Sequence, residues 1–237
     1  MKVLVSIISL IAFLLVALPA PLYRFGVVEL GTAFTGFKFG LVVGIAALVL
    51  LVIQVIFKRK TVSIASAAIA VIFSTIAIAL PLGMMTTAKN VPPIHDISTD
   101  LMNPPEFVAI APLRADAPNP VEYAGTEAAE QQRTAYPDLQ TLTYSQSESE
   151  LVEASRQAVE NLGWELVNTD ADKGIVEATE TTAWFGFKDD VVVRVTDNDS
   201  ERLVDIRSKS RIGKSDLGKN AARIHSFIEE LDKVLGN

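Results

Sequence analysis

The sequence contains no cysteine and only two histidines among its 237 residues. The absence of cysteine excludes disulfide bonds, thiolate zinc sites and cysteine nucleophiles. His95 and His225 are the only imidazoles, and no cluster of ligands around them has the spacing of a zinc site. We therefore expect no metal and no cofactor.

Acidic residues are almost missing from the first 85 residues, where Glu29 is the only one beside six basic residues. The remaining 152 residues carry 15 basic and 27 acidic residues, which gives them a net charge of −12. This division indicates a membrane anchor followed by a globular domain. Nucleic acid is not an expected partner, because phosphate binding requires a basic surface.

Charged residues are also missing from three apolar runs of about the length that crosses a bilayer. These runs are residues 3–22, 39–57 and 62–82. Lys58, Arg59 and Lys60 lie between the second and third runs and predict a cytoplasmic loop, because short basic loops stay inside. The sequence thus predicts a multi-pass protein of the cell inner membrane, embedded in the lipid bilayer, whose C-terminal domain is periplasmic.

The first apolar run allows two interpretations. Lys2, the apolar core and the small residues around Ala20 also resemble a signal peptide with its cleavage site. We favour a retained helix. Either interpretation leaves the C-terminal domain on the non-cytoplasmic side, because the next two runs form a hairpin.

Glycines recur every four residues at the start of the second run, at Gly36, Gly40 and Gly44. Such a stripe allows another helix to approach closely. We favour packing within the three-helix bundle, and the alternative is a homo-oligomer that forms through this stripe.

Residues 86–137 form a proline-rich connecting segment between the anchor, residues 1–85, and the soluble domain, residues 138–237. So many fixed φ angles predict extended, partly ordered chain. Residues 101–114 are expected to lie along the surface of the domain, and residues 122–132 to form a short helix.

The soluble domain shows alternating helix and strand patterns. Ser147 and Glu150 form a capping box for a helix that ends at Gly163, and an amphipathic helix closes the chain. Between and before them we expect strands at residues 139–144, 164–168, 175–183, 187–196 and 202–210, the last two joined by the turn at residues 197–200. The order β-α-β-β-β-β-α predicts an α+β domain, helix-grip-like in shape, with an antiparallel sheet covered by helices on one face.

The other face of this sheet is expected to be uncovered. Because side chains alternate along strands, it would carry Asp190, Arg194, Asp205, Arg207, Lys209 and Arg211. One interpretation is a solvated ladder of ion pairs. The other is a site for a small anionic ligand or an envelope protein partner, since arginine pairs well with carboxylate and phosphate.

Several runs match a known family. They are residues 93–100 (PIHDISTD), 136–137 (YP), 177–179 (EAT), 184–190 (WFGFKDD) with Arg194, and 205–224, which contains DIRSKSRIG and NAARI. Over residues 90–235 the chain resembles the domain of unknown function 1499 family of bacterial envelopes and plant plastids. The resemblance implies no activity, but its characteristic residues coincide with the charged face and add Asn220 at the entry to the last helix.

Catalytic constellations are weak. Gly213-Lys214-Ser215 is not a phosphate loop, because Ser208 stands where the first glycine is required. His95 beside Asp96, and Asp216 at a helix start, are the weak catalytic candidates. We therefore favour a non-catalytic binding or scaffolding protein over an enzyme. The alternative is an envelope hydrolase or transferase acting on lipid or cell-wall substrates, with Asp189 and Asp190 added to its site.

Overall fold

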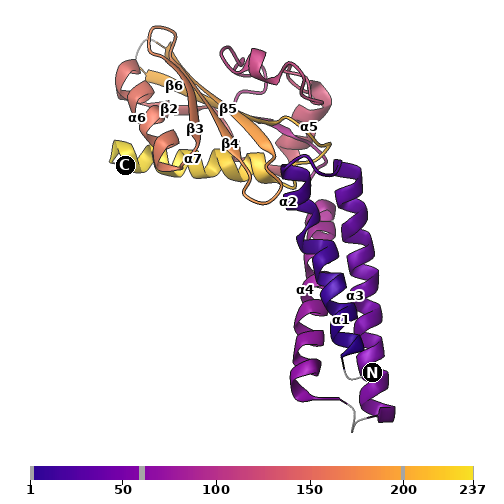
Figure 1. Cartoon of the computed structure of the whole chain (residues 1–237). Coiled ribbons are helices and arrows are strands. Elements are labelled where there is room, and N and C mark those ends of the chain that lie inside the picture. Colours follow the sequence, from indigo (N-terminus) through magenta and orange to yellow (C-terminus); the bar gives the residue numbers. More distant parts are fainter. Residues whose placement is uncertain (1–2, 59–61, 199–200, 237) are drawn as a thin grey trace. The chain divides into compact units, whose positions relative to one another are not determined.

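The computed structural model of the chain describes residues 3–58, 62–198 and 201–236. The chain divides into two compact units (Figure 1). The first comprises Met1–Lys89 and Ala183–Gly186, and the second comprises Asn90–Thr182 and Phe187–Asn237. The second unit therefore includes almost all of the proline-rich connecting segment.

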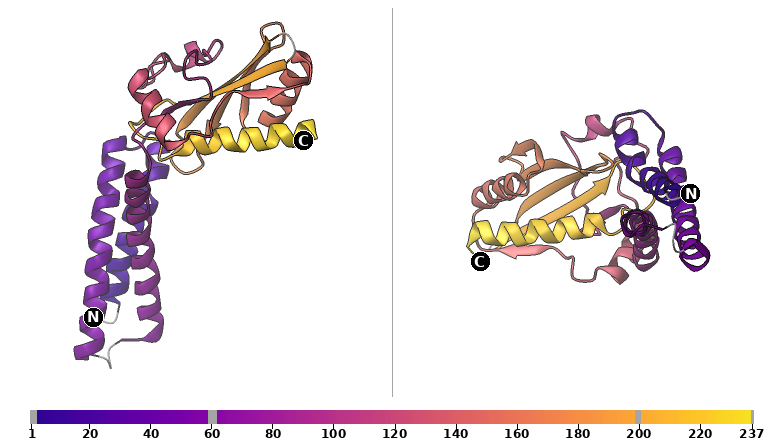
Figure 2. Two further views of the ribbon diagram at one scale, coloured as in Figure 1. Left: turned by 180° about the vertical axis from the view of Figure 1, so that it is seen from behind. Right: turned by 60° about the horizontal axis from the view of Figure 1, so that its bottom comes forward.

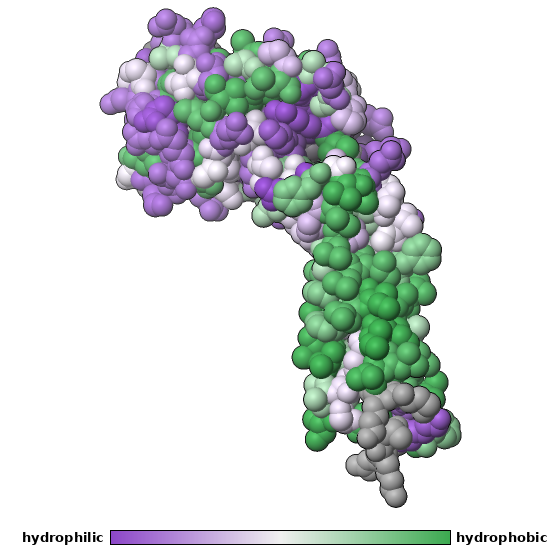
Figure 3. Space-filling model, in the orientation of Figure 1, coloured by the Kyte–Doolittle hydropathy of each residue, from purple (hydrophilic) through white to green (hydrophobic). Residues whose placement is uncertain are grey.

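The first unit consists mainly of helices. They are α1 (Leu4–Ala17), α2 (Pro19–Arg24), α3 (Leu30–Lys58) and α4 (Ile64–Asn90). Three stretches are long and apolar enough to cross a membrane: Leu4–Arg24, Leu30–Lys58 and Ile64–Asn90. Apolar residues predominate on the face of these helices that Figure 3 shows. The prediction of three candidate transmembrane helices is thus confirmed by length and composition. Arg59 and Lys60, used to predict orientation, and Lys2, used for the signal-peptide interpretation, lie outside the described residues.

The glycine stripe of α3 is in contact with other helices of the same bundle. A Cβ atom at Gly36 would lie 2.7 Å from Pro19 Cγ, and one at Gly40 would lie 3.0 Å from the Ala12 carbonyl oxygen. At Gly44 the nearest atom, 3.2 Å away, belongs to Ile78 of α4. These close approaches support packing within the bundle, and homo-oligomerisation through the stripe stays a prediction.

The second unit contains a six-stranded antiparallel sheet in the order β1-β6-β5-β4-β3, with β2 also paired to β6. The strands are β1 (Asp96–Ser98), β2 (Leu142–Tyr144), β3 (Glu165–Asp170), β4 (Ile175–Thr181), β5 (Lys188–Asn198) and β6 (Glu201–Ser210). The helices are η2 (Ala111–Arg114), α5 (Thr126–Ala135), α6 (Glu148–Asn161) and α7 (Lys219–Leu235). From β2 onward the order is the predicted β-α-β-β-β-β-α, and the α+β class is confirmed. Asp199 and Ser200 of the predicted turn lie outside the described residues.

Helices α6 and α7 cover one face of the sheet (Figure 2). The capping box of α6 is present, since the Ser147 hydroxyl accepts from the Glu150 amide and the Glu150 carboxylate accepts from the Ser147 amide. Apolar residues of both helices, such as Leu151 and Phe227, are fully buried with Ile206 of β6 in one core. Burial of this amphipathic pair supplies the main apolar stabilisation of the unit.

The opposite face is also covered, so the expectation of an uncovered face is wrong. Residues 99–125, here called the strap, leave β1 and cross this face before α5 begins (Figures 1 and 2). Phe107 and Ile110 of the strap pack on Val192 of β5 and Ile175 of β4 in a second apolar cluster. Two features explain why the sequence did not predict this cover. Strand β1 has only three residues, which is too few for a periodic pattern. The prolines of the strap favour extended chain, but extended chain can still pack on a sheet.

Candidate functional site

The charged residues predicted for the exposed face lie beneath the strap. Lys209, Arg207 and Asp190 are only 1%, 2% and 0% exposed. Together with acidic and basic partners they form what we call the ion network: Arg114, Arg194, Arg207, Lys209 and Arg211 with Asp96, Asp100, Glu177, Asp190 and Asp205. The predicted face exists, but Asp190, Asp205, Arg207 and Lys209 are buried instead of solvated, and Arg194 and Arg211 are half-buried.

Asp96 of β1 is the centre of one part of the network. Its Oδ1 accepts from Arg207 Nε at 2.9 Å, and its Oδ2 accepts from Arg207 Nη2 at 3.0 Å and from Lys209 Nζ at 2.9 Å. The amide of Ala124 donates a fourth bond at 3.0 Å. Burial lowers the pKa of Lys209, and the charge of Asp96 opposes that shift. Asp96 is therefore saturated with donors and is not a free general base.

The strap encloses Arg207 with aromatic rings as well. The guanidinium carbon lies 4.9 Å from the ring centre of Phe107 and 5.4 Å from that of Tyr123. Such cation–π contacts add attraction when the cation is removed from water. Burial, helped by the charge of Asp96, raises the pKa of Tyr123 to about 12, so its phenol stays neutral.

Asp190 of β5 holds a second part of the network. Arg211 donates to both of its carboxylate oxygens at 2.8 Å, and Arg114 of η2 lies 3.2 Å from Oδ2. Thr179 donates a further bond at 2.8 Å. Burial lowers the pKa of Arg114, and Asp190 opposes this shift. The pairing is thus diagonal, since the register partner of Asp190 is Lys209.

Asp205 and Arg194 face each other in register across β5 and β6. Arg194 Nη2 donates to Asp205 and to Asp100, each at 2.9 Å. Hydroxyl groups of Thr99 and Thr141 also donate to Asp205, at 3.0 and 2.7 Å. Burial tends to raise the pKa of Asp100, but bonds from strap amides and from Arg194 outweigh it and the pKa is lowered.

Glu177 of β4 is a member of the network that the sequence marked only as part of the family run 177–179 and not as a site residue. It is fully buried, and its carboxylate accepts from the amides of Val108, Ala109 and Ile110 at 2.7, 2.8 and 3.2 Å. The carboxylate therefore fastens the strap to the sheet. The signal available was its position in a strand whose neighbours, Val176 and Ala178, face the core on the other side.

The ion network is electrically balanced, with five cations against five carboxylates. Each predicted arginine has a carboxylate partner within 2.9 Å. An added anion would find no excess positive charge in the network, and the strap covers most of its cations. The arrangement explains the dense charged motif as a device that fixes the strap.

Asn220 does not belong to this face. It lies on α7, where its amide donates to the His95 carbonyl and to Ser210 Oγ, each at 3.0 Å, and its carbonyl oxygen accepts from Ser208 at 2.7 Å. Arg223, one turn further along α7, pairs with Asp189 at 2.6 Å. These bonds tie the last helix to β6, and Asn220 lies at the entry to that helix, apart from the ion network.

The weak catalytic candidates, Asp216 and His95, each contact other groups and not one another. Asp216 accepts from the amides of Gly218 and Asn220 at 2.8 Å, and burial raises its pKa against the effect of those bonds. His95 Nδ1 lies 3.4 Å from the Lys214 carbonyl oxygen, a long contact. Within residues 3–58, 62–198 and 201–236, no group of three or more histidine and acidic side chains is arranged to hold a metal.

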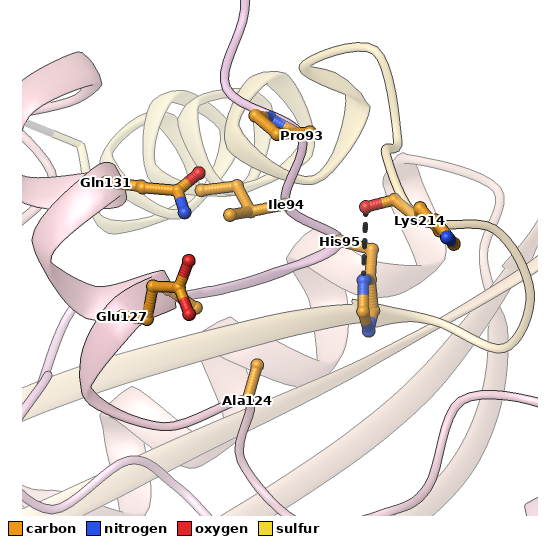
Figure 4. A pocket seen from close by; sticks show the side chains of 8 residues that line it. Pro93, Ile94, His95, Ala124, Glu127, Gln131 and Lys214 are labelled. Carbon is orange, nitrogen blue, oxygen red and sulfur yellow. Dashed lines mark hydrogen bonds between the residues drawn. The ribbon is translucent and has the colours of Figure 1, made fainter.

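His95 instead lines a pocket of about 300 Å³ on the second unit. Ile94 and His95 form one wall, Glu127, Ala128 and Gln131 of α5 form another, and Lys214 reaches it from the loop before α7 (Figure 4). No sequence pattern indicated Glu127 or Gln131 as site residues, because the two come near His95 only when α5 packs beside β1.

Fold and site together define an α+β domain with a strapped, internally neutralised sheet, joined to apolar helices long enough to span a membrane. Residues 96–231 match the family described as Protein of unknown function (DUF1499), which is more than half of the chain. The protein belongs to this family, as its motifs indicated. A search of curated proteins gave no match.

Proposed function

We propose that the protein is a membrane-tethered, non-catalytic binding or scaffolding protein of the cell envelope. Its three apolar helices cross the cell inner membrane, and its second unit is periplasmic. The run of Lys58, Arg59 and Lys60 in the sequence supports this direction, because short cytoplasmic loops are rich in Lys and Arg.

The balanced ion network is the observation that carries the non-catalytic part. Catalytic carboxylates usually need a perturbed pKa and access to substrate. Asp96 has four donors and Asp190 is enclosed by two arginines and a threonine. These residues stabilise a rigid domain, which suits a protein that presents a binding surface.

The alternative of an envelope hydrolase or transferase requires a base near an accessible nucleophile or substrate. His95 is its accessible imidazole, and its candidate partners Asp96 and Asp216 accept bonds from other groups. The pocket beside His95 is therefore interpreted as a binding site.

Orientation can be tested cleanly because the chain has no cysteine. Single cysteines at Lys58 and at Asp172, in the turn between β3 and β4, would be treated with a membrane-impermeant maleimide on spheroplasts. We expect Asp172→Cys to react at once and Lys58→Cys to react only after lysis. The reverse pattern would overturn the proposed orientation.

Binding can be tested by quantitative capture of the tagged full chain from native membranes. The control is a Glu127→Gln/Lys214→Gln variant, which removes both charges of the pocket and leaves the ion network intact. We expect a protein, lipid or small molecule that is enriched with the wild type and lost with the variant. Identical captured sets would contradict binding at the pocket, and turnover of the captured molecule that is lost in His95→Ala would contradict the non-catalytic part.

A further inference from the structure

The pocket differs from the ion network because its charged side chains, Glu127 and Lys214, are exposed and unpaired. Neither the Glu127 carboxylate nor the Lys214 ammonium has a hydrogen bond or an ion pair with any described residue. In the ion network, by contrast, every carboxylate has at least two donors. Glu127 and Lys214 line the pocket from different elements, α5 and the loop before α7. In Figure 4 the Lys214 carbonyl oxygen faces His95 and the flexible Lys214 side chain extends away from Glu127.

The size and lining of the pocket suit a small ligand. Its volume of about 300 Å³ is at the lower end for ligand sites. Ile94 and Ala128, which are 4% and 7% exposed, supply apolar surface from the core. Gln131 adds an amide that both donates and accepts, and His95 adds an imidazole. A molecule of amino-acid size with a short apolar portion fits this lining.

The electrostatics select the charge of the ligand. A simple anion would pair with Lys214 but would meet the Glu127 carboxylate and a domain of net charge −12. A simple cation would meet Lys214. A zwitterion has no net charge to be repelled, and its two ends can pair with both residues at once.

We propose that the pocket binds a small zwitterion, with its ammonium on Glu127 and its oxoanion on Lys214. This inference rests on the proposed binding function and names the ligand class. The His95 tautomer that carries its proton on Nδ1 faces the Lys214 carbonyl oxygen and leaves Nε2 to accept from the ligand's ammonium. A free amino acid and the phosphoethanolamine headgroup of a lipid share this chemistry.

The test is calorimetric titration of the purified full chain in detergent. The zwitterions are glycine, β-alanine, 4-aminobutyrate and 6-aminohexanoate, which increase the charge separation stepwise, and phosphoethanolamine. Propionate and propylammonium each carry one of the two charges. We expect one zwitterion to bind at a single site at least about tenfold more tightly than either singly charged compound, the gain expected from one added charge-assisted bond.

The two sources are distinguished within the same series. Tightest binding of an amino carboxylate indicates a free amino acid or peptide end, and tightest binding of phosphoethanolamine indicates a lipid headgroup. The proposal is overturned if no zwitterion binds saturably, or if propionate or propylammonium binds equally well.

Variants assign the binding to the two charges. Glu127→Gln and Lys214→Gln should each weaken binding about tenfold or more. Glu130→Gln on the same helix and Lys219→Gln at the start of α7 are matched controls and should bind as the wild type does. The exchange Glu127→Lys/Lys214→Glu should restore binding, because a zwitterion can bind in the reverse direction. Unchanged affinity in both single variants would overturn the assignment.

Failure of this inference is distinguishable from failure of the proposed function. If no zwitterion binds but capture from membranes still depends on Glu127 and Lys214, the ligand class is wrong and the binding function stands. If capture does not depend on them but a zwitterion binds with the expected variant pattern, the ligand class stands, and the pocket is not the surface that holds the captured partners.

Discussion

Asp96 and Arg207 form a bidentate ion pair between neighbouring strands, although they are not register partners. The register places Asp96 opposite Lys209 and Ser98 opposite Arg207, yet Arg207 reaches both oxygens of Asp96 at 2.9 and 3.0 Å. The same carboxylate also accepts from Lys209. One acid from the short strand β1 therefore pairs with two buried cations of β6 and fastens β1 to β6 at the edge of the sheet.

Replacing Asp96 by asparagine should destabilise the second unit strongly. The change leaves two buried cations without their carboxylate, and breaking a buried pair in this way costs about 3–5 kcal/mol. Lys209→Met should cost less, because Asp96 then remains paired with Arg207. Chemical denaturation of the full chain in detergent measures both. Equal losses in the two variants would contradict this account of Asp96.

Replacing Glu177 by glutamine should loosen the strap. The neutral amide retains one acceptor oxygen for three strap amides and loses the charge that strengthens those bonds, at a cost of about 1.5–3 kcal/mol. Hydrogen exchange should accelerate at residues 108–110 more than in β5 or β6. The control is Glu165→Gln, an exposed position on β3, which should leave exchange of the strap unchanged.

Asp216 makes stability depend on pH in a predictable direction. Because burial raises its folded-state pKa above the ordinary 3.8, the folded state holds the proton more tightly than the unfolded state. The stability that Asp216 contributes to folding is fully present below pH 3.8 and is lost as the pH rises through the higher pKa of the folded state. Asp216→Asn lacks this titration.

The wild type should therefore gain stability relative to Asp216→Asn as the pH is lowered through that window. Denaturation midpoints of both proteins, measured at pH 7 and in steps towards pH 4, give the difference directly. If the difference in midpoint stays constant, or if the wild type loses stability relative to Asp216→Asn as the pH falls, the carboxyl of Asp216 does not titrate as its environment indicates.

Gly40 should be sensitive to size while Gly31 is not. Alanine at Gly40 would press its Cβ against Val16 and the Ala12 carbonyl group of α1, whereas a Cβ at Gly31 meets nothing within 4 Å. We expect Gly40→Ala to lower the thermal midpoint of the detergent-solubilised chain. Gly31→Ala should leave it equal or slightly higher, because alanine favours the helix.

The capping box of α6 offers a final test of local structure. Ser147→Ala removes the hydroxyl that accepts from the Glu150 amide, and loss of such a cap costs about 1 kcal/mol. Ser149→Ala, in the first turn of the same helix, is the matched control. A similar loss in both variants would mean that the effect does not come from the cap.

Local patterns predicted most of the elements. The capping box, the turn residues and the period-two alternation of β5 and β6 act over a few residues, so they can be read without knowing the rest of the fold. The family motif in residues 205–224 indicated the family in the same way, and the match over residues 96–231 shows it. The alternation even identified which side chains of β6 share a face.

The environment of that face could not be predicted in this way. Asp96 and Arg207 are separated by 111 positions along the chain, and Glu177 lies 67 positions or more from the strap amides that it binds. Strand β1 has only three residues and lies in a proline-rich segment, so no periodicity marked it. The expectation of an exposed charged face failed because it assumed that such a segment does not pack.

The sequence by itself determined the apolar helices, the α+β order and the family, because each depends on composition or on neighbours within a few residues. Only the tertiary structure decided that the charged face is buried and neutral, and that Glu127 and Lys214 line one pocket. Both outcomes depend on long-range pairing of the strap and β1 with β6. The free energy of an ion pair depends on its partners and on how much water surrounds it, and only the tertiary structure decides both.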